Sequence, residues 1–281
     1  METHKKIIAV IWTFNPGEFE IKQVLQSIIR QVDEIIIVDN GSIYRSYKKV
    51  VKSSPFLRSK TTLIELKRNY GVRALNIGIE EAINAGADFI LLLDDDTVLY
   101  EGVIKRVISC WRKLIQFFPN VGVVGLTEGY CCKNLIQVET RVFSGSIIDK
   151  RVLESGIKIR EEFFLDQADF DFFHEIKRAG YEVLQFDGGI KEHKLGVKIK
   201  FGGRILRCEP LHRYYYIVRN STVLLLERKL PLFFYIRQLI IWGFPSALVK
   251  GVKRTMRTLI MGLAHGIFKR LGYLDPKFLE S

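Results

Sequence analysis

The stretch "LLLDDDTVL" at residues 91–99 joins an apolar run to three adjacent carboxylates, Asp94, Asp95 and Asp96. A continuous apolar run of this length is typical of a strand that is buried on both faces of a sheet. The carboxylates that follow repel one another, and none of them can stay unpaired in a dry interior. Because hard cations take oxygen ligands, we expect a divalent cation to neutralise this group at the end of the strand.

Similar apolar runs alternate with helical patterns along the first half of the chain. They predict strands at 7–14, 34–39, 61–66, 88–93 and 121–126. Between them, apolar residues recur at helical spacing in 20–30 and 72–85. This alternation predicts βαβ units and an α/β fold with a mostly parallel sheet flanked by helices. Ligands of such sheets bind beyond the carboxyl ends of the strands, where three polar segments fall: "TFN" (13–15), "VDNGS" (38–42) and "DDD" (94–96).

The pattern after residue 127 is less regular. The segment "RVFSGSIID" at 141–149 predicts a strand followed by a turn, and 166–179 predicts a helix that stops at Gly180. A further strand is expected at 181–187. No Pro-, Gly- or Ser-rich linker interrupts the sequence, so we expect no domain boundary before residue 205.

Composition and charge restrict the class of protein and of partner. The 281 residues are 48% hydrophobic and 26% charged, which is typical of a globular protein. The formal net charge of +12 favours an anionic partner, such as a phosphorylated metabolite, an anionic membrane or a nucleic acid. Much of the excess lies late in the chain, because residues 228–273 hold nine Lys or Arg and no Asp or Glu.

The C-terminal segment combines this positive charge with apolar residues. Residues 232–249 are strongly apolar but contain Arg237 and Pro245, so we expect a poor membrane-spanning helix. Residues 246–270 predict one basic amphipathic helix, with basic and apolar residues on opposite faces. Such a helix suits the surface of an anionic bilayer. The alternative is a helix that packs on the main domain and exposes its basic face to water.

Cysteine usage and the N-terminus bear on the compartment. The four cysteines form no CxxC pair, so we expect neither a zinc site nor a disulfide framework, and a reducing cytosol is favoured. The N-terminal "METHKKIIAVIW" is too short before the first strand for a signal peptide. The expected location is therefore cytoplasmic, on the inner face of the cell membrane.

Seven segments, in order, resemble one known family. They are "VIWTFN" (10–15), "IIIVDNGS" (35–42), "RNYGVRALNIGI" (68–79), "ILLLDDDT" (90–97), "FLDQADFDFFHEIKRAGY" (164–181), "EHKLG" (192–196) and "RYYYIVRN" (213–220). Together they resemble the family 2 glycosyltransferases of the GT-A fold, and within them the rhamnosyltransferase-like branch. The resemblance implies a Rossmann-like GT-A domain over 1–225, followed by a basic, apolar helical tail over 226–281.

The resemblance also implies roles for residues of the donor and metal sites. Asp94 and Asp96 match the DxD signature, and with His193 they would bind Mg²⁺ or Mn²⁺ beside the donor diphosphate. Asp39, at a strand end, can accept hydrogen bonds from a base or ribose, although an ordinary Asx turn is the alternative. The expected donor-binding residues are Thr13, Asn15, Asp39, Asn40, Asn69, Gly71, Asn76, Asp94, Asp95, Arg213, Tyr215 and Arg219. For Asn76 the alternative is a packed helix start, and for the tyrosines it is a buried aromatic helix face.

The catalytic base is expected in "DQADFDF". The resemblance implies an acid pair here, with Asp169 as the base and Asp171 on the same segment; Asp166 is the alternative base. A single base that deprotonates the acceptor hydroxyl implies inversion at the sugar carbon. One departure is Glu175, because many members of the family carry Arg at that position, so any support from such an Arg is absent here.

These observations predict an inverting, metal-dependent glycosyltransferase. The expected donor is dTDP-rhamnose or a UDP-sugar, and the expected acceptor is a glycan or a polyprenyl-linked glycan at an anionic membrane surface. One alternative is a phosphohydrolase that uses Asp94 as its nucleophile together with Asp96. Another is a non-enzymatic RNA-binding protein, but the acidic clusters would repel a nucleic acid, so none is expected as a partner. The oligomeric state does not follow from the sequence.

Overall fold

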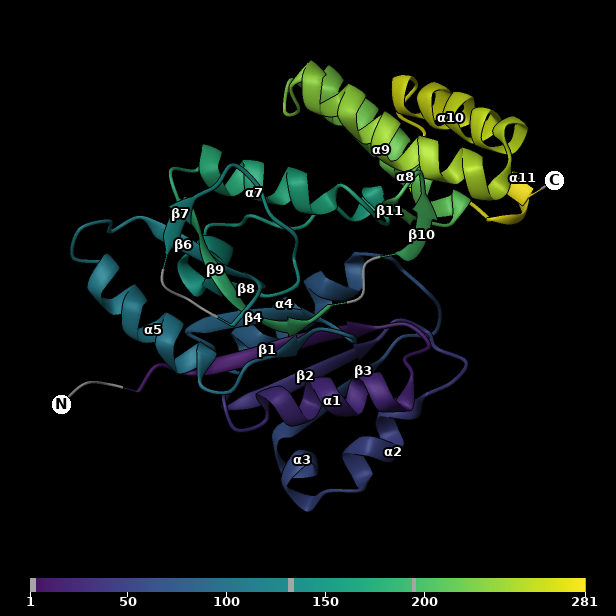
Figure 1. Ribbon diagram of the computed structural model, residues 1–281. Helices are drawn as coiled ribbons and strands as arrows, with labels where there is room; N and C mark the ends of the chain where they lie inside the picture. Colours follow the sequence, from purple (N-terminus) through teal and green to yellow (C-terminus); the bar gives the residue numbers. More distant parts are fainter. Residues whose placement is uncertain (1–3, 131–133, 194–195, 281) are drawn as a thin grey trace. The chain divides into compact units, whose positions relative to one another are not determined.

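The computed structural model describes residues 4–130, 134–193 and 196–280 (Figure 1). The chain forms two compact units. The sheet unit comprises Met1–Ile159 and Phe172–Lys194, and the helical unit comprises Arg160–Asp171 and Leu195–Ser281. This division differs from the expected boundary at residue 225, because residues 196–225 fall with the C-terminal helices. Cys131 and Cys132, like Lys194 and Leu195 of the quoted "EHKLG", lie outside the described residues.

A nine-stranded mixed sheet forms the centre of the sheet unit within the described residues. Its first four strands are β1 (Ile7–Thr13), β2 (Glu34–Asp39), β3 (Thr61–Glu65) and β4 (Phe89–Asp94), and they run parallel in the order β3-β2-β1-β4. The remaining strands are β5 (Val98–Leu99), β6 (Val121–Glu128), β7 (Leu135–Gln137), β8 (Ser146–Asp149) and β9 (Glu182–Glu192). Strand β8 pairs antiparallel with both β4 and β6, whereas β6 and β9 run parallel to each other, so the sheet is mixed beyond β4.

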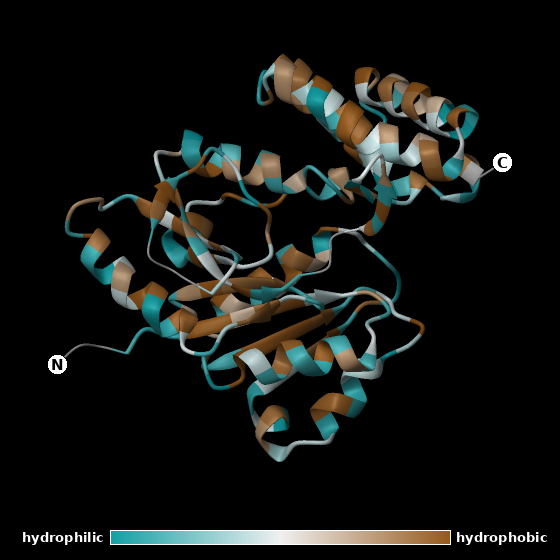
Figure 2. Ribbon diagram, viewed as in Figure 1, coloured by the Kyte–Doolittle hydropathy of each residue, from teal (hydrophilic) through white to brown (hydrophobic). Residues whose placement is uncertain are grey.

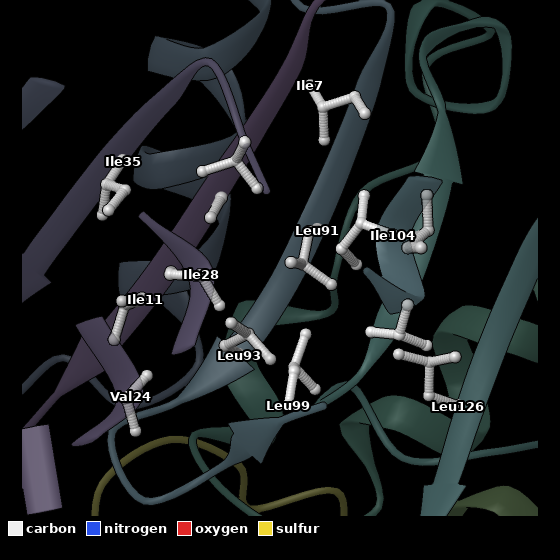
Figure 3. Packing of buried hydrophobic residues seen from close by; sticks show 14 of the residues in the cluster. Ile7, Ile11, Val24, Ile28, Ile35, Leu91, Leu93, Leu99, Ile104 and Leu126 are labelled. Atoms are coloured by element: carbon white, nitrogen blue, oxygen red, sulfur yellow. The ribbon is translucent and has the colours of Figure 1, made fainter. Parts of the chain in front are cut away.

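Helices cover both faces of the parallel strands (Figure 1). One face packs against α1 (Glu18–Ile28), α2 (Ser46–Lys52), α3 (Pro55–Lys60) and α5 (Val103–Leu114). Figure 3 shows Ile11 of β1 beside Val24 and Ile28 of α1, and Leu91 and Leu93 of β4 in the same apolar layer. The predicted strands and the helices at 20–30 and 72–85 are therefore present, with ends shifted by a few residues.

The other face of these strands packs against α4 (Arg73–Asn84). Gly78 makes this contact close, because a Cβ at that position would lie 2.4 Å from a methyl carbon of Val10 and 2.9 Å from one of Val38. The helix thus lies directly on β1 and β2, and any larger residue at position 78 would push it away. The sheet unit also contains α6 (Lys150–Glu154) and most of α7 (Ala168–Arg178), whose first residues belong to the helical unit.

The helical unit contains the 3₁₀ turn η1 (Glu161–Phe163), an antiparallel hairpin and four helices among the described residues. The hairpin is formed by β10 (Val197–Phe201) and β11 (Arg204–Cys208). The helices are α8 (Leu211–Leu226), α9 (Leu232–Lys250), α10 (Val252–Ile267) and α11 (Lys277–Glu280). The expected single helix over 246–270 is wrong, because Gly251, with φ of 90°, separates α9 from α10.

Small residues form the face of α10 that packs on α8. A Cβ at Gly262 would lie 2.8 Å from Val218, and one at Gly266 would lie 2.6 Å from Thr222. The buried residues of α10 are Thr255, Thr258, Gly262 and Gly266. Several of its large apolar residues are exposed, and Val252 and Ile260 are 67% and 61% exposed.

Helix α9 exposes still more apolar surface (Figure 2). The helix has 19 residues, and an 18-residue window within it has a mean hydropathy of 1.5, which makes it long and apolar enough, by length and composition alone, to cross a membrane. This differs from the expectation based on Arg237 and Pro245, since the helix runs unbroken through both. Phe233 is 72% exposed, whereas Tyr235, Gly243, Pro245 and Ser246 are buried.

Candidate active site

The carboxyl ends of three parallel strands bring the first set of predicted residues together. Thr13 at the end of β1 is in register with Asp39 at the end of β2, and Trp12 is in register with Asp94 at the end of β4. This is the edge at which open α/β sheets bind their ligands. The arrangement follows from the shared direction of these strands, which the alternating sequence pattern predicts.

Neutral donors hold the loop that contains the three carboxylates. The indole Nε1–H of Trp12 donates to Asp94 Oδ1 at 2.6 Å, and the hydroxyl of Thr13 donates to Asp95 Oδ2 at 2.5 Å. The backbone N–H of Asp94 donates to Ser144 Oγ at 2.9 Å. These contacts fix the loop from β1 on one side and from the segment before β8 on the other.

Asp94, Asp96 and His193 form a candidate metal centre. One ligand atom from each lies within 4.8 Å of the others. The Nε2 atom of His193 is 3.3 Å from Asp94 Oδ2 and 3.8 Å from Asp96 Oδ1. Ligands about 2 Å from one Mg²⁺-sized ion lie roughly 3–4 Å apart, so the spacing and the donor set fit a divalent cation. Asp95, which was expected to bind the donor, accepts the hydroxyl of Thr13.

The negative charges of Asp94 and Asp96 favour a positive charge beside them, either on the protonated imidazole of His193 or on a bound cation. Burial lowers the pKa of His193, but the hydrogen bond and the negative charge of Asp94, with that of Asp96, outweigh burial and raise the pKa overall. Burial raises the pKa of Asp95 to about 6, and the charges of Asp94 and Asp96 act in the same direction. A bound cation would take over the role of the imidazole proton, since metal ligands bind deprotonated.

A buried arginine that the sequence analysis did not single out supports this loop from behind. The guanidinium of Arg141 donates from Nε to Ser146 Oγ at 2.7 Å and from Nη2 to the carbonyl oxygens of Leu126 at 2.7 Å and Ser144 at 3.3 Å. Ser144 in turn lies against Thr97, with hydroxyl oxygens 2.7 Å apart. A single Arg in an irregular segment carries no periodic signal, so its burial could not be read from the sequence.

Asp39 organises the loop after β2. It is fully buried, and its Oδ1 accepts the backbone N–H of Ser42 at 3.0 Å, while its Oδ2 accepts the hydroxyl of Tyr47 at 2.9 Å. The Arg45 guanidinium lies 3.3 Å from the same Oδ2. Burial, with the hydrogen bond to Asp39, raises the pKa of Tyr47. A nucleoside contact by Asp39 would add to, or exchange with, these bonds.

Asn15 holds the tip of the same loop from the β1 side. Its side-chain Oδ1 accepts the backbone N–H groups of Ile43 at 2.8 Å and Tyr44 at 3.1 Å. As a result Tyr44 is 72% exposed beside the exposed Phe14 and Ile43. An exposed aromatic ring beside a polar strand end can stack on a nucleobase.

The other predicted donor-binding residues of the sheet unit make contacts within the protein. Asn40 donates to the carbonyl oxygen of Gly71 and accepts from the backbone of Tyr70, and Asn69 accepts the N–H of Gly71. Gly71 has φ of 61°, which supports the expected strained turn. Asn76 is paired in both directions with the backbone of Ile159, as a packed helix start predicts.

The three acids of "DQADFDF" differ sharply in their partners. Asp166 is held by Arg213, whose Nη2 lies 2.5 Å from Asp166 Oδ1, and Arg213 also contacts Glu209 at 3.2 Å. Asp171 is buried and accepts from Lys229 Nζ at 2.6 Å. Asp169 makes no ion pair within the described residues and accepts the backbone N–H of Phe170 at 2.9 Å.

Asp169 is therefore the acid whose protonation can change near neutral pH. Burial raises the pKa of Asp169 to about 7; the Phe170 N–H opposes this rise, and the charge of Asp166 adds to it. A carboxyl group with a pKa near the working pH is suited to general base catalysis. The contrast with the ion-paired Asp166 favours Asp169 over the alternative base.

Tyr215 and Arg219 gain no support as donor ligands. Both are buried, and the Tyr215 hydroxyl lies 2.7 Å from His265 Nδ1. Arg219 donates to the carbonyl oxygens of Phe163 at 2.8 Å and Gly272 at 2.7 Å. These bonds hold α8 to the segments on either side of it. These contacts agree with the alternative, in which this segment is a helix with a buried aromatic face.

Comparisons with known proteins agree with this geometry. Residues 8–130 match the sequence model of the family "Glycosyl transferase family 2". The dTDP-rhamnosyl transferase RfbF of Shigella flexneri is 27% identical over 262 residues, which cover 84% of this chain and 86% of that protein.

Solved glycosyltransferase structures share the fold. S. aureus TarS 1-349 in complex with UDP-GlcNAc matches with a TM-score of 0.60 at 14% identity, over 93% of this chain and 80% of that one. The mannosyltransferase PcManGT from Pyrobaculum calidifontis, in complex with GDP-Man and Mn²⁺, matches with a TM-score of 0.54 at 17% identity, over 99% of this chain and 79% of that one. The GT-A fold is confirmed, and neither the phosphohydrolase nor the RNA-binding alternative is favoured. Over residues 8–130 the chain thus matches the family 2 glycosyltransferases, and the comparisons support a glycosyltransferase that is similar to rhamnosyltransferases.

Proposed function

We propose that this glycosyltransferase is metal-dependent, inverts the configuration of the sugar carbon and uses dTDP-rhamnose as its first-choice donor. The observation that carries the proposal is the cluster of Asp94, Asp96 and His193 at the carboxyl edge of the sheet. The named activity of the Shigella relative supports the donor, and the Mn²⁺ complex of the mannosyltransferase supports the metal. UDP-sugars remain the second donor class to test.

Asp94, Asp96 and His193 would hold Mg²⁺ or Mn²⁺, which when bound supplies Lewis-acid stabilisation of the departing diphosphate. Trp12 and Thr13 keep the acidic loop in place through their hydrogen bonds. The exposed Tyr44 ring would cover the nucleobase.

Asp169 acts as the general base in this proposal. Its carboxylate takes the proton from an acceptor hydroxyl, and the oxygen of that hydroxyl forms a bond to the sugar carbon. The bond from that carbon to the diphosphate breaks, and the diphosphate leaves with the electron pair. Asp166 and Asp171 are held by Arg213 and Lys229, so they support the segment and leave Asp169 to move the proton.

The acceptor is proposed to be a glycan, or a glycan carried on a polyprenyl lipid, at the cytoplasmic face of an anionic membrane. Support comes from the exposed apolar residues of α9 and α10 together with the basic residues of the same helices. Apolar side chains would enter the interfacial layer, and Lys or Arg would meet anionic headgroups.

A thermal-shift panel of sugar nucleotides with and without Mn²⁺ tests the donor and the metal, because a ligand raises the Tm of the protein that binds it. We expect dTDP-rhamnose to raise the Tm most, and only with the metal present. Asp96→Ala should abolish this metal-dependent shift. Asp88→Asn, at the opposite end of β4 and paired with Lys5, is the matched control and should retain it. A shift that ignores Mn²⁺ and Mg²⁺ in the unmodified protein would contradict the metal site.

A further inference from the structure

The helical unit contains a cavity of about 320 Å³ that the proposed transfer reaction does not use. It lies at the start of α8, where Leu211 and His212 line it, and at the junction of α9 and α10, where Lys250 and Arg254 line it. Pro276 and the buried Leu279 complete the apolar part of its wall. The cavity is therefore apolar at its base and basic at its rim.

Lys250 and Arg254 give this cavity positive charge. Among the described residues, none that lines it is acidic. Lys250 and Arg254 are exposed, and neither makes an ion pair with a carboxylate of the described residues. Glu209, which precedes the cavity in the chain, is buried and is held by Arg213. The two exposed cations, Lys250 and Arg254, are therefore available to an anion that fits this cavity.

Exposed apolar residues are the neighbours in sequence of the basic residues that line the cavity. Leu248 and Val249, just before Lys250, are 44% and 48% exposed, and Val252 follows on the other side of Gly251. Gly251 makes the sharp turn that places the end of one helix and the start of the next at the same cavity. An anion bound here would thus be surrounded by apolar side chains, as a headgroup is at the boundary of a bilayer.

We propose that this cavity binds the phosphate group of a membrane lipid. The inference rests on the proposed membrane association and not on the sugar transfer. Lys250 and Arg254 would donate to the phosphate oxygens, with Arg254 offering the forked donors that suit them. Leu248, Val249 and Val252 would enter the acyl-chain boundary. The size and the apolar base of the cavity favour one phosphate group over an extended nucleic acid, and no aromatic side chain lines it to stack on a base.

Vesicle co-sedimentation of the full chain tests the proposal. Three vesicle types are compared: phosphatidylcholine alone, phosphatidylcholine with phosphatidic acid, and phosphatidylcholine with oleate at the same negative charge. We expect the strongest binding to the vesicles that contain phosphatidic acid. Equal binding to the oleate vesicles would overturn the proposal, because charge alone would then account for it.

Two double variants with reversed charges distinguish binding by the cavity from attraction to the overall positive charge of the helices. Lys250→Glu with Arg254→Glu should weaken binding to phosphatidic acid vesicles about tenfold more than Lys253→Glu with Arg257→Glu. The second pair makes the same charge change on α10 outside the cavity. Equal losses in the two double variants would also overturn the proposal.

Two further measurements distinguish the source of the phosphate and the failure of the proposed function. If inorganic phosphate raises the Tm of the protein but vesicles with phosphatidic acid do not bind, the cavity serves a free anion and the lipid proposal is wrong. The Tm shift with dTDP-rhamnose and Mn²⁺ should be the same in both double variants. If that shift is missing from the unmodified protein as well, the donor proposal fails while the lipid result stands.

Discussion

The two acidic clusters of this chain have similar compositions but opposite surroundings. In the sheet unit, Asp94 accepts from the indole of Trp12 and lies 3.3 Å from the imidazole of His193, and Asp95 accepts from the hydroxyl of Thr13; His193 is also 3.8 Å from Asp96. In the helical unit, Asp166 and Asp171 are held by an arginine and a lysine. The first cluster is suited to a cation from outside the chain, whereas the second is neutralised by the chain except at Asp169. The partners, and not the acidic residue type, separate a ligand-holding cluster from a proton-transferring one.

The strongest test of this contrast is Asp169→Asn. We expect kcat to fall about 10²- to 10⁴-fold, the range lost when a general base is removed, while donor affinity changes less than about twofold. Turnover assays and the thermal shift with donor and Mn²⁺ measure the two effects separately. Asp166→Asn is the matched comparison and should retain most of its turnover. If Asp166→Asn is the inactive variant instead, the two assignments must be exchanged.

The pH dependence of turnover sharpens the same assignment. Burial raises the pKa of Asp169 to about 7, and the base acts only when deprotonated. Activity should therefore rise nearly tenfold per pH unit well below pH 7, roughly fiftyfold from pH 5 to pH 7, and level off above pH 8. A flat profile over that range would show that a group with a lower pKa carries the step.

The raised pKa of Asp169 also affects stability. A rise in pH that increases activity should decrease the stability of the folded state. The folded state binds the Asp169 proton more tightly than the unfolded state, so this group contributes stability below the unfolded pKa of about 3.9 that is lost as pH rises toward 7. Asp169→Asn should consequently have a higher Tm than the unmodified protein at pH 8, and the gap should close at pH 4. Calorimetric scans across this range check the sign.

Lys229→Met tests whether the second cluster is truly neutralised by the chain. Asp171 would keep a buried charge without its lysine, and removing one partner of a buried pair costs about 3–5 kcal/mol. Arg160 at 4.0 Å can compensate in part, so we expect the lower end, about 3 kcal/mol in the free energy of unfolding. Asp171→Asn together with Lys229→Met should recover much of the loss. No change in the single variant would mean that this pair is not coupled.

The smallest expected effect concerns Ser144, which supports the loop that contains Asp94, Asp95 and Asp96. Ser144→Ala removes the acceptor for the Asp94 N–H and the partner of Thr97, which should cost about 1 kcal/mol of stability and weaken Mn²⁺ binding severalfold. Ser155→Ala removes a similar hydroxyl at the end of α6 and serves as its control. Titration with Mn²⁺ should leave that control unchanged.

The parallel half of the sheet could be predicted because each of its strands carries its own signal. Ile35–Val38 and Phe89–Leu93 are continuous apolar runs, and a buried parallel strand needs nothing else from the rest of the chain. The convergence of Thr13, Asp39 and Asp94 then followed from strand direction alone. A strand followed by a turn was expected in 141–149, and the strand β8 is present at the end of that segment; its antiparallel direction was not predicted, because direction depends on pairing partners that no local pattern reveals.

The packing of the helical unit was harder to predict because it depends on small residues at the contact between helices. Gly262 and Gly266 form the contact with α8, whereas sequence patterns count large apolar residues as the buried face. The burial of Arg219 and Arg141 is equally hidden, because each is satisfied by backbone carbonyls distant in sequence. Helix breaks such as Gly251 are visible only when the left-handed backbone is known.

The small-residue contact between α8 and α10 also decides how the protein can be handled. Truncation of the chain after α8 would remove the exposed apolar surface of α9 and α10. However, those two helices cover Tyr214 and Val218 of α8. A chain that ends after α8 would therefore expose this face of α8 in place of the apolar surface of α9 and α10. Better-behaved preparations should come from mild detergent, or from polar replacements at outward positions such as Phe233 and Ile260, with the C-terminal helices left in place.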